Sequence, residues 1–274
     1  MGRSLTHAAQ SRQAEAFCTE RGYAFRDRVV NLPVSGLLFR SSKNVVMEGV
    51  IDALDADAPF VYARVSARGR RLRGLKLIML PLPRPVPNMV LLSTSGNVLK
   101  NLGIALKESQ RLSVEGDFRS LFTLYCPAAY ERDALYVFTP DLLGRLMDAA
   151  AGCDLEIVDD RVLIYAPAHA FSKPGHLDEM PGLVRYLHEK FDRQTRRYRD
   201  ERRPDEALDD PFRRAQVTTG RGTEETHLVG ASGRRLRTRT TAWQKAGIAA
   251  AAALALSAAL YWLGMVATAL FAAT

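Results

Sequence analysis

Four carboxylates gather in the middle of the chain: Glu115, Asp117, Glu131 and Asp133. Paired carboxylates can catalyse hydrolysis, because one can donate a proton while the other accepts one. These four have no His, Ser or Cys partner at a motif spacing, and the chain contains no nucleophile elbow, phosphate loop or dinucleotide-binding loop. The sequence therefore leans away from an enzyme, and a hydrolase that uses these carboxylates is the alternative hypothesis.

Metal and cofactor sites have no support in the sequence. The three cysteines, Cys18, Cys126 and Cys153, are far apart in the chain, and the five histidines form no pair at the spacing of metal ligands. We expect neither a metal nor a cofactor. The cysteines are expected to be buried thiols in a reducing compartment.

A basic run offers a different chemistry, the binding of phosphate. It contains Arg68, Arg70, Arg71, Arg73 and Lys76 and no acidic residue. Such side chains can contact the phosphate of a lipid head group or of a nucleic acid. No aromatic side chain lies among them to stack on a base, which argues against nucleic acid. A solvated hairpin tip explains the run best, and lipid head groups come second.

The end of the chain is its most apolar part. Residues 246–274 are 29 residues without a charged side chain. As a helix they would extend ~43 Å, more than the ~30 Å hydrocarbon core of a bilayer. Their Leu, Ile, Val and Phe side chains favour insertion by roughly a few kcal/mol. We predict one transmembrane helix over residues 246–272.

Charged and aromatic residues around this span predict its orientation. A basic cluster precedes it, and no charged side chain follows it. The positive-inside rule then places residues 1–245 in the cytoplasm, so that the protein is a single-pass protein of the inner membrane. Trp243 is the expected anchor at the inner interface, and Tyr261 and Trp262 are expected near the outer one. The basic cluster, which we expect to face anionic lipid, consists of Arg234, Arg235, Arg237, Arg239 and Lys245.

The remaining chain predicts an α+β domain over residues 5–203, with an antiparallel, β-rich centre and flanking helices. A helix is expected over residues 4–21, ending at Gly22. The apolar runs separated by polar turns predict strands at residues 44–54, 59–67, 74–82, 88–93, 110–116 and 122–127. These can form two sub-sheets, over about residues 23–114 and 115–166.

The second half of the domain mixes strand and helix signals. Residues 134–138 are another apolar run, and we expect a helix after the N-cap Thr139 that ends at Gly152. Residues 153–167 predict a hairpin that turns at Asp159 and Asp160. A trailing helix is expected over residues 181–203, and residues 204–245 predict a disordered basic linker.

Three short motifs carry a resemblance to a known group of proteins. The runs E-G-D-F (115–118), Y-E-x-D-A-L (130–135) and T-P-D-L-L (139–143) resemble an uncharacterised family of bacterial membrane-associated proteins of unknown function. The resemblance is clearest over residues 45–166. It implies membrane association and a shared cytosolic β-rich domain, and it supplies no activity and no catalytic residue.

Together these signals predict a single-pass, C-terminally anchored bacterial membrane protein. Its partners are expected to be membrane lipids, through the span and the basic cluster, and an unidentified protein. The favoured role is a binding or scaffolding module at the cytoplasmic face of the membrane.

Overall fold

In the computed structural model the first of two units of the chain ends at Arg237, and the predicted span lies outside the described residues. None of the helices in the described part of the chain is long and apolar enough to cross a membrane. The described residues are 7–30, 32–42, 44–67, 74–113, 118–150, 152–168, 170, 176–200, 202 and 233–238.

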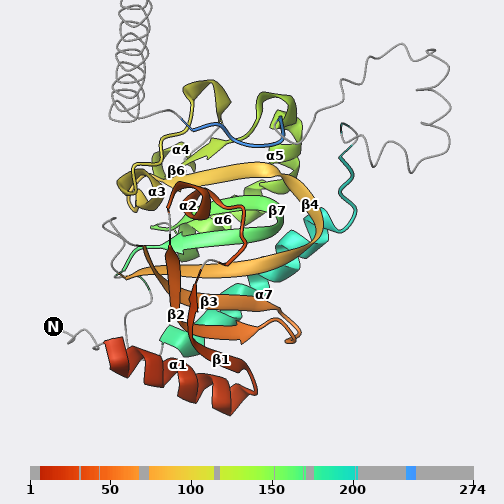
Figure 1. Cartoon of the computed structure of the whole chain (residues 1–274). Coiled ribbons are helices and arrows are strands. Elements are labelled where there is room, and N and C mark those ends of the chain that lie inside the picture. Colours follow the sequence, from red (N-terminus) through yellow and green to blue (C-terminus); the bar gives the residue numbers. More distant parts are fainter. Residues whose placement is uncertain are drawn as a thin grey trace, which may run out of the picture. The chain divides into compact units, whose positions relative to one another are not determined.

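The unit is an α+β fold built on an antiparallel sheet, as expected (Figure 1). Seven strands of the described residues join one sheet, with the order β1-β2-β3-β4-β6-β5 and with β7 paired to β4. Strands from both predicted sub-sheet ranges therefore belong to the same sheet. Their bounds are β1 Ala24–Val30, β2 Val45–Ala53, β3 Phe60–Ala67, β4 Leu75–Ser93, β5 Arg111–Leu112, β6 Phe122–Tyr125 and β7 Asp154–Ala166.

Strand β4 is the centre of this sheet. It runs for 19 residues through a segment with proline at every second position, from Pro81 to Pro87. It pairs with β7 over most of its length, with register shifts around Val86. Its other edge pairs first with β3 and then, from Val90 on, with β6. Proline has no N–H to donate to a neighbouring strand, so the stretch between these two partners is open to other contacts.

Both faces of the sheet are buried, each under its own hydrophobic core. Strand β3 shows the alternation: Phe60 and Tyr62 belong to the first core, whereas Val61, Ala63 and Val65 belong to the second. Successive side chains of a strand point to opposite faces, so a strand covered on both sides becomes almost continuously apolar.

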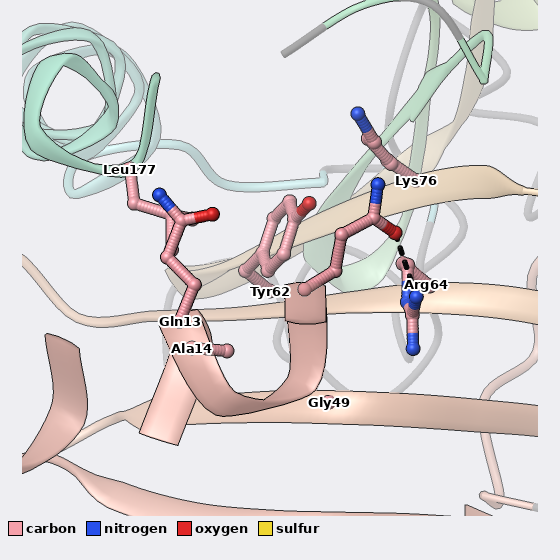
Figure 2. Close-up of a pocket in the computed structure, with 8 residues that line it drawn as sticks. Gln13, Ala14, Gly49, Tyr62, Arg64, Lys76 and Leu177 are labelled. Atoms are coloured by element: carbon pink, nitrogen blue, oxygen red, sulfur yellow. Dashed lines mark hydrogen bonds between the residues drawn. The ribbon is translucent and has the colours of Figure 1, made fainter. Parts of the chain in front are cut away.

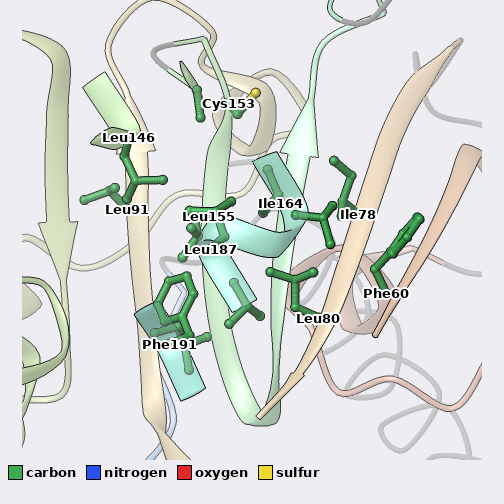
Figure 3. Packing of buried hydrophobic residues seen from close by; sticks show 14 of the residues in the cluster. Phe60, Ile78, Leu80, Leu91, Leu146, Cys153, Leu155, Ile164, Leu187 and Phe191 are labelled. Atoms are coloured by element: carbon green, nitrogen blue, oxygen red, sulfur yellow. The ribbon is translucent and has the colours of Figure 1, made fainter. Parts of the chain in front are cut away.

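Helices cover the first core, and shorter segments cover the second. The first core includes α7, whose Leu187 and Phe191 pack on Leu155 and Ile164 of β7 (Figure 3). The helices that contribute to it are α1 His7–Arg21, α4 Phe118–Leu121, α5 Glu131–Val137, α6 Pro140–Ala150 and α7 His176–Thr195. The second core is covered by α2 Leu37–Ser41, by α3 Val98–Asn101 and by Leu236. Two short 3-10 helices, η1 Glu108–Gln110 and η2 Ala128–Tyr130, complete the described elements.

Several predicted helix ends are found where local chemistry places them. Helix α1 ends at Arg21, before Gly22 with a φ of 71°. Helix α6 begins after Thr139, whose Oγ1 accepts a hydrogen bond from the Leu142 amide at 3.4 Å.

The start of helix α7 differs from the prediction. Helix α7 begins at His176, five residues before the predicted start, so that Pro181 lies inside it.

Other elements differ from the sequence-based expectations. The apolar run at residues 134–138 lies mostly in helix α5, a helix that was not predicted. The predicted hairpin at residues 153–167 is one bent strand, β7, because Asp159 takes a φ of 53° while pairing with β4 continues on both sides of it. Strand β1 was not predicted.

Candidate functional site

A four-residue segment from the far end of the chain docks on the sheet. We call residues 234–237 the C-terminal arm, which lies in the blue segment in Figure 1. The Arg234 carbonyl accepts a hydrogen bond from the Asn88 amide at 3.0 Å, and the Leu236 amide donates to Asn88 Oδ1 at 3.1 Å. The Arg237 amide donates to Gln110 Oε1 at 3.0 Å. The arm is therefore held through its backbone along the edge of β4 that lies between β3 and β6.

The side chain of Leu236 fixes the arm in the second core. Leu236 is only 2% exposed, and burying a leucine side chain stabilises a fold by about 1.5–3 kcal/mol. It is the one apolar residue in the run G-R-R-L-R-T-R at 233–239. The arm thus combines one buried apolar side chain with flanking cations.

Asn88 is oriented for this contact by two further hydrogen bonds. Its Nδ2 donates to Glu156 Oε1 at 3.1 Å and to the Ile157 carbonyl at 2.8 Å. With Nδ2 engaged on the β7 side, Oδ1 faces the Leu236 amide. A buried amide that uses both ends in this way leaves no polar group without a partner.

Glu156, which accepts the hydrogen bond from Asn88 Nδ2, is itself held by two further hydrogen bonds. Its Oε2 accepts hydrogen bonds from the Leu37 amide and from the Tyr165 hydroxyl, both at 2.8 Å. Burial raises the pKa of Glu156, and these hydrogen bonds oppose that shift. Gly36 is required beside them, because a Cβ at that position would lie 2.4 Å from Leu163 Cδ1.

Two ion pairs hold the charged side chains of the arm. Arg234 Nε lies 2.9 Å from Asp200 Oδ2, and Asp200 is fully buried. The Tyr130 hydroxyl also donates to Asp200 Oδ2, at 3.1 Å. Burial raises the pKa of Asp200, and the Arg234 guanidinium opposes this shift. Arg235 pairs with Asp159 at 2.7 Å near the surface.

The predicted lipid-facing cluster is thus divided. Arg234 and Arg235 are held by carboxylates of the folded unit, where the sequence predicts a free linker, and Arg237 is exposed. The other two members, Arg239 and Lys245, lie outside the described residues, as do the predicted anchors Trp243, Tyr261 and Trp262.

The four carboxylates of the hydrolase hypothesis are placed only in part. Glu115 and Asp117 lie outside the described residues. Glu131 is exposed on the first turn of α5. Asp133 accepts a hydrogen bond from the Tyr198 hydroxyl at 2.8 Å and another from Arg202 Nη1 at 3.1 Å. Asp133 therefore joins α5 to the end of the α7 region.

The predicted phosphate contacts are also placed only in part. Arg68, Arg70, Arg71 and Arg73 lie outside the described residues. Lys76 is in β4, is 3% exposed, and donates a hydrogen bond to the Ala170 carbonyl. Desolvation, together with nearby Arg64, lowers the pKa of Lys76 to about 8.

The cysteines are buried thiols in the described unit, and burial raises the pKa of Cys18, Cys126 and Cys153. A raised thiol pKa lowers the thiolate fraction and with it the reactivity toward oxidants and metals. No group of three or more His, Cys, Asp and Glu side chains among the described residues is arranged to hold a metal ion.

Comparison with known proteins gives one distant structural similarity. No protein-family model and no curated protein matches the chain. A crystal structure of the mycobacterial trehalose monomycolate transport factor A, TtfA, is similar with a TM-score of 0.46 and 10% sequence identity. The match covers 66% of this chain and 93% of that one. A similarity of this size supports no inference about function.

Proposed function

We propose that the protein is a single-pass bacterial membrane protein whose folded unit is a binding module at the cytoplasmic face. The span at residues 246–272 and the basic residues before it support the anchoring, as does the resemblance to membrane-associated proteins. The observation that carries the proposal is the docking of the C-terminal arm on Asn88.

Docking of the arm shortens the tether between the folded unit and the predicted span. Eight residues, 238–245, separate the arm from residue 246. At ~3.3–3.6 Å per residue these reach at most ~28 Å. A free linker over residues 204–245 would have a typical reach of ~35 Å and a far longer maximum. The module is therefore kept beside the head groups, where a protein that binds membrane components has to work.

A binding role is favoured over hydrolysis by the contacts of Asp133. Its carboxylate oxygens are used by Tyr198 and Arg202, which belong to the packing of the unit. A general base needs a free oxygen within reach of the substrate proton. Glu131 is exposed on the first turn of α5, and it is not among the residues that line the pockets of the described part of the chain.

Extraction of membranes with alkaline carbonate tests the anchoring. We expect the full-length protein to remain with the membrane and a variant that ends at Lys245 to be released. A tag fused after Thr274 is expected to be accessible from the outer side of the inner membrane. Release of the full-length protein by carbonate, or a cytoplasmic tag, would refute the proposed topology.

A further inference from the structure

The C-terminal arm carries two cations that two different environments can neutralise. In the folded unit, Arg234 pairs with Asp200 at 2.9 Å and Arg235 pairs with Asp159 at 2.7 Å. The same two arginines belong to the basic cluster that precedes the predicted span. Anionic phospholipids attract arginines beside a membrane span, so their phosphates can take the place of the two carboxylates.

The arm cannot serve both environments at once. The Arg234 side chain is 16% exposed and lies against the fully buried Asp200. Leu236 is buried in the second core, and the backbone between these two residues is held by Asn88. Arg234 therefore reaches a lipid head group only when the arm leaves the sheet. Docking on the sheet and binding to lipid are competing states.

The buried cations of the sheet do not have this freedom. Arg64 of β3 donates to Gln10 Oε1 at 2.7 Å, and Lys76 of β4 donates to the Ala170 carbonyl. Figure 2 shows these two cationic side chains pointing away from each other, with the bond to Gln10 as a dashed line. Both cations belong to paired strands and stay in place while the sheet is folded. The arginines of the arm lie outside the strands and can change partners.

The arm is small enough to leave without unfolding the unit. Residues 203–233 separate it from Arg202, so its departure does not pull directly on α7. One buried leucine, two ion pairs and hydrogen bonds of its backbone hold it. A segment with so few contacts opens at a fraction of the free energy of global unfolding. Release of the arm is therefore a local event.

Each contact that the arm loses has a counterpart at an anionic bilayer surface. Lipid phosphates replace the carboxylates, and the Leu236 side chain can enter the boundary of the acyl chains as it enters the core of the unit. Anionic lipid favours release about fivefold for each arginine near the surface, and hence about 30-fold for Arg234 and Arg235 together. Because a factor of this size is comparable with the opening equilibrium of a weakly held segment, lipid composition can shift the balance.

We propose that the C-terminal arm is a latch that anionic phospholipids release. Where anionic lipids are scarce, the arm stays docked and eight residues, 238–245, join the unit to the predicted span. Where they are abundant, the arm lies on the bilayer and the longer linker joins the two. This inference rests on the proposed topology, which brings the arm within reach of the head groups, and it adds regulation to the docking contact.

Hydrogen exchange of the Asn88 amide tests the latch. This amide belongs to the sheet and donates to the Arg234 carbonyl at 3.0 Å, so it reports the departure of the arm whatever the arm binds next. The full-length protein is compared in bilayers of phosphatidylcholine with and without phosphatidylglycerol. We expect Asn88 to exchange about tenfold faster or more with phosphatidylglycerol, while the Leu91 amide of β4 is unchanged. High salt screens the lipid charge and is expected to remove the difference.

Arg235→Gln and Arg132→Gln form a matched pair of variants. The ion pair between Arg235 and Asp159 is near the surface, so its loss changes docking in phosphatidylcholine little. With one charge fewer, Arg235→Gln is expected to reduce the effect of phosphatidylglycerol about fivefold. Arg132 is exposed on α5, and Arg132→Gln is expected to keep the full effect.

The latch is overturned if Asn88 exchanges equally in both kinds of bilayer, or if Arg235→Gln responds like the wild type. Carbonate extraction reports on the span alone, so the two proposals can fail separately. A protein that stays in the membrane and shows no effect of lipid charge refutes the latch. A protein that carbonate releases refutes the topology, and the exchange of Asn88 is then followed with added vesicles of the same two compositions.

Discussion

Leu236 and Asn88 are 148 positions apart in the sequence, yet the Leu236 amide donates to Asn88 Oδ1 at 3.1 Å. The contact joins the end of the folded unit to β4, its longest strand. Because eight residues separate the arm from the predicted span, this hydrogen bond would, under the proposed topology, limit the distance between the domain and the membrane.

Replacing Leu236 by Ala tests how much the arm contributes to stability. A buried Leu→Ala change costs about 2–5 kcal/mol in a rigid core. The loss at Leu236 is limited to the free energy of arm docking, since the arm can detach while the sheet remains folded. We therefore expect Leu236→Ala to cost about 1–3 kcal/mol, less than Leu163→Ala in the same core, in denaturant unfolding followed by circular dichroism.

Leu54, which is 47% exposed, supplies the matched control. Leu54→Ala is expected to change the free energy of unfolding by less than about 0.5 kcal/mol. Equal losses for Leu236→Ala and Leu163→Ala would show that the arm does not behave as a separable element.

The Arg234–Asp200 pair predicts a pH-dependent penalty. Arg234→Met leaves the buried Asp200 carboxylate without its cation, a change that costs about 3–5 kcal/mol in a rigid site. Here the loss at neutral pH is limited to the free energy of arm docking, about 1–3 kcal/mol, for the same reason as at Leu236. The penalty is expected to shrink as the pH falls, because a protonated Asp200 needs no cation. Arg234→Met with Asp200→Asn is expected to recover part of the loss. Arg237 is exposed and contacts Gln110 through its backbone amide, so Arg237→Met is expected to cost little. An equal cost for Arg234→Met and Arg237→Met would contradict the assignment of the Arg234–Asp200 ion pair.

The carboxylates of α5 are expected to differ in their effect on stability. Asp133→Asn weakens the charge-assisted hydrogen bonds from Tyr198 and Arg202 and is expected to cost about 1–2 kcal/mol. Glu131→Gln is expected to change stability by no more than about 0.5 kcal/mol. Thermal unfolding measures both. A hydrolytic activity that both variants abolish without a change in Tm would instead support the hydrolase hypothesis.

Asp154 predicts a stability that depends on pH. Its oxygens accept hydrogen bonds from the Ser93 and Leu99 amides at 2.7 and 2.6 Å, yet burial raises its pKa from 3.8 to about 6. The folded state then binds a proton more tightly than the unfolded state. Stability is expected to rise as the pH falls from about 7 to about 4, by up to roughly 3 kcal/mol from this group.

Asp154→Asn is expected to remove this part of the slope, while Asp160→Asn at an exposed position keeps it. The comparison is made between denaturant titrations of the two variants and the wild type, since other buried carboxylates contribute slopes of the same sign. Identical slopes in the wild type and Asp154→Asn would show that Asp154 titrates normally.

Local signals in the sequence predict much of the fold. Thr139 and Gly22 act within one helical turn of their own positions, so their effects can be read directly. The run at residues 134–138 shows no period in the sequence because it is apolar throughout. Its burial follows a helix instead: Ala134, Val137 and Phe138 are buried, while Leu135 and Tyr136 are about half exposed. Only packing against the sheet reveals that period.

The candidate site depends on contacts that the sequence does not contain locally. An Arg-rich run before an apolar span is typical of a topology signal, and Arg234 and Arg235 match that pattern. Their pairing with Asp200 and Asp159 depends on how β4, β7 and the end of α7 come together. Leu236, the lone leucine among the arginines, is the one local signal that this segment is buried, because an apolar side chain contributes no stability in an exposed linker.

Hydrogen exchange of the arm in the full-length, membrane-reconstituted protein tests the central claim most directly. We expect the Leu236 and Arg237 amides to exchange slowly in the wild type. In Leu236→Asp these positions are expected to exchange rapidly while the Leu91 amide of β4 stays protected. Exchange at residues 236 and 237 of the wild type as fast as in an unstructured peptide would show that the arm is not docked, and the short tether would be refuted with it.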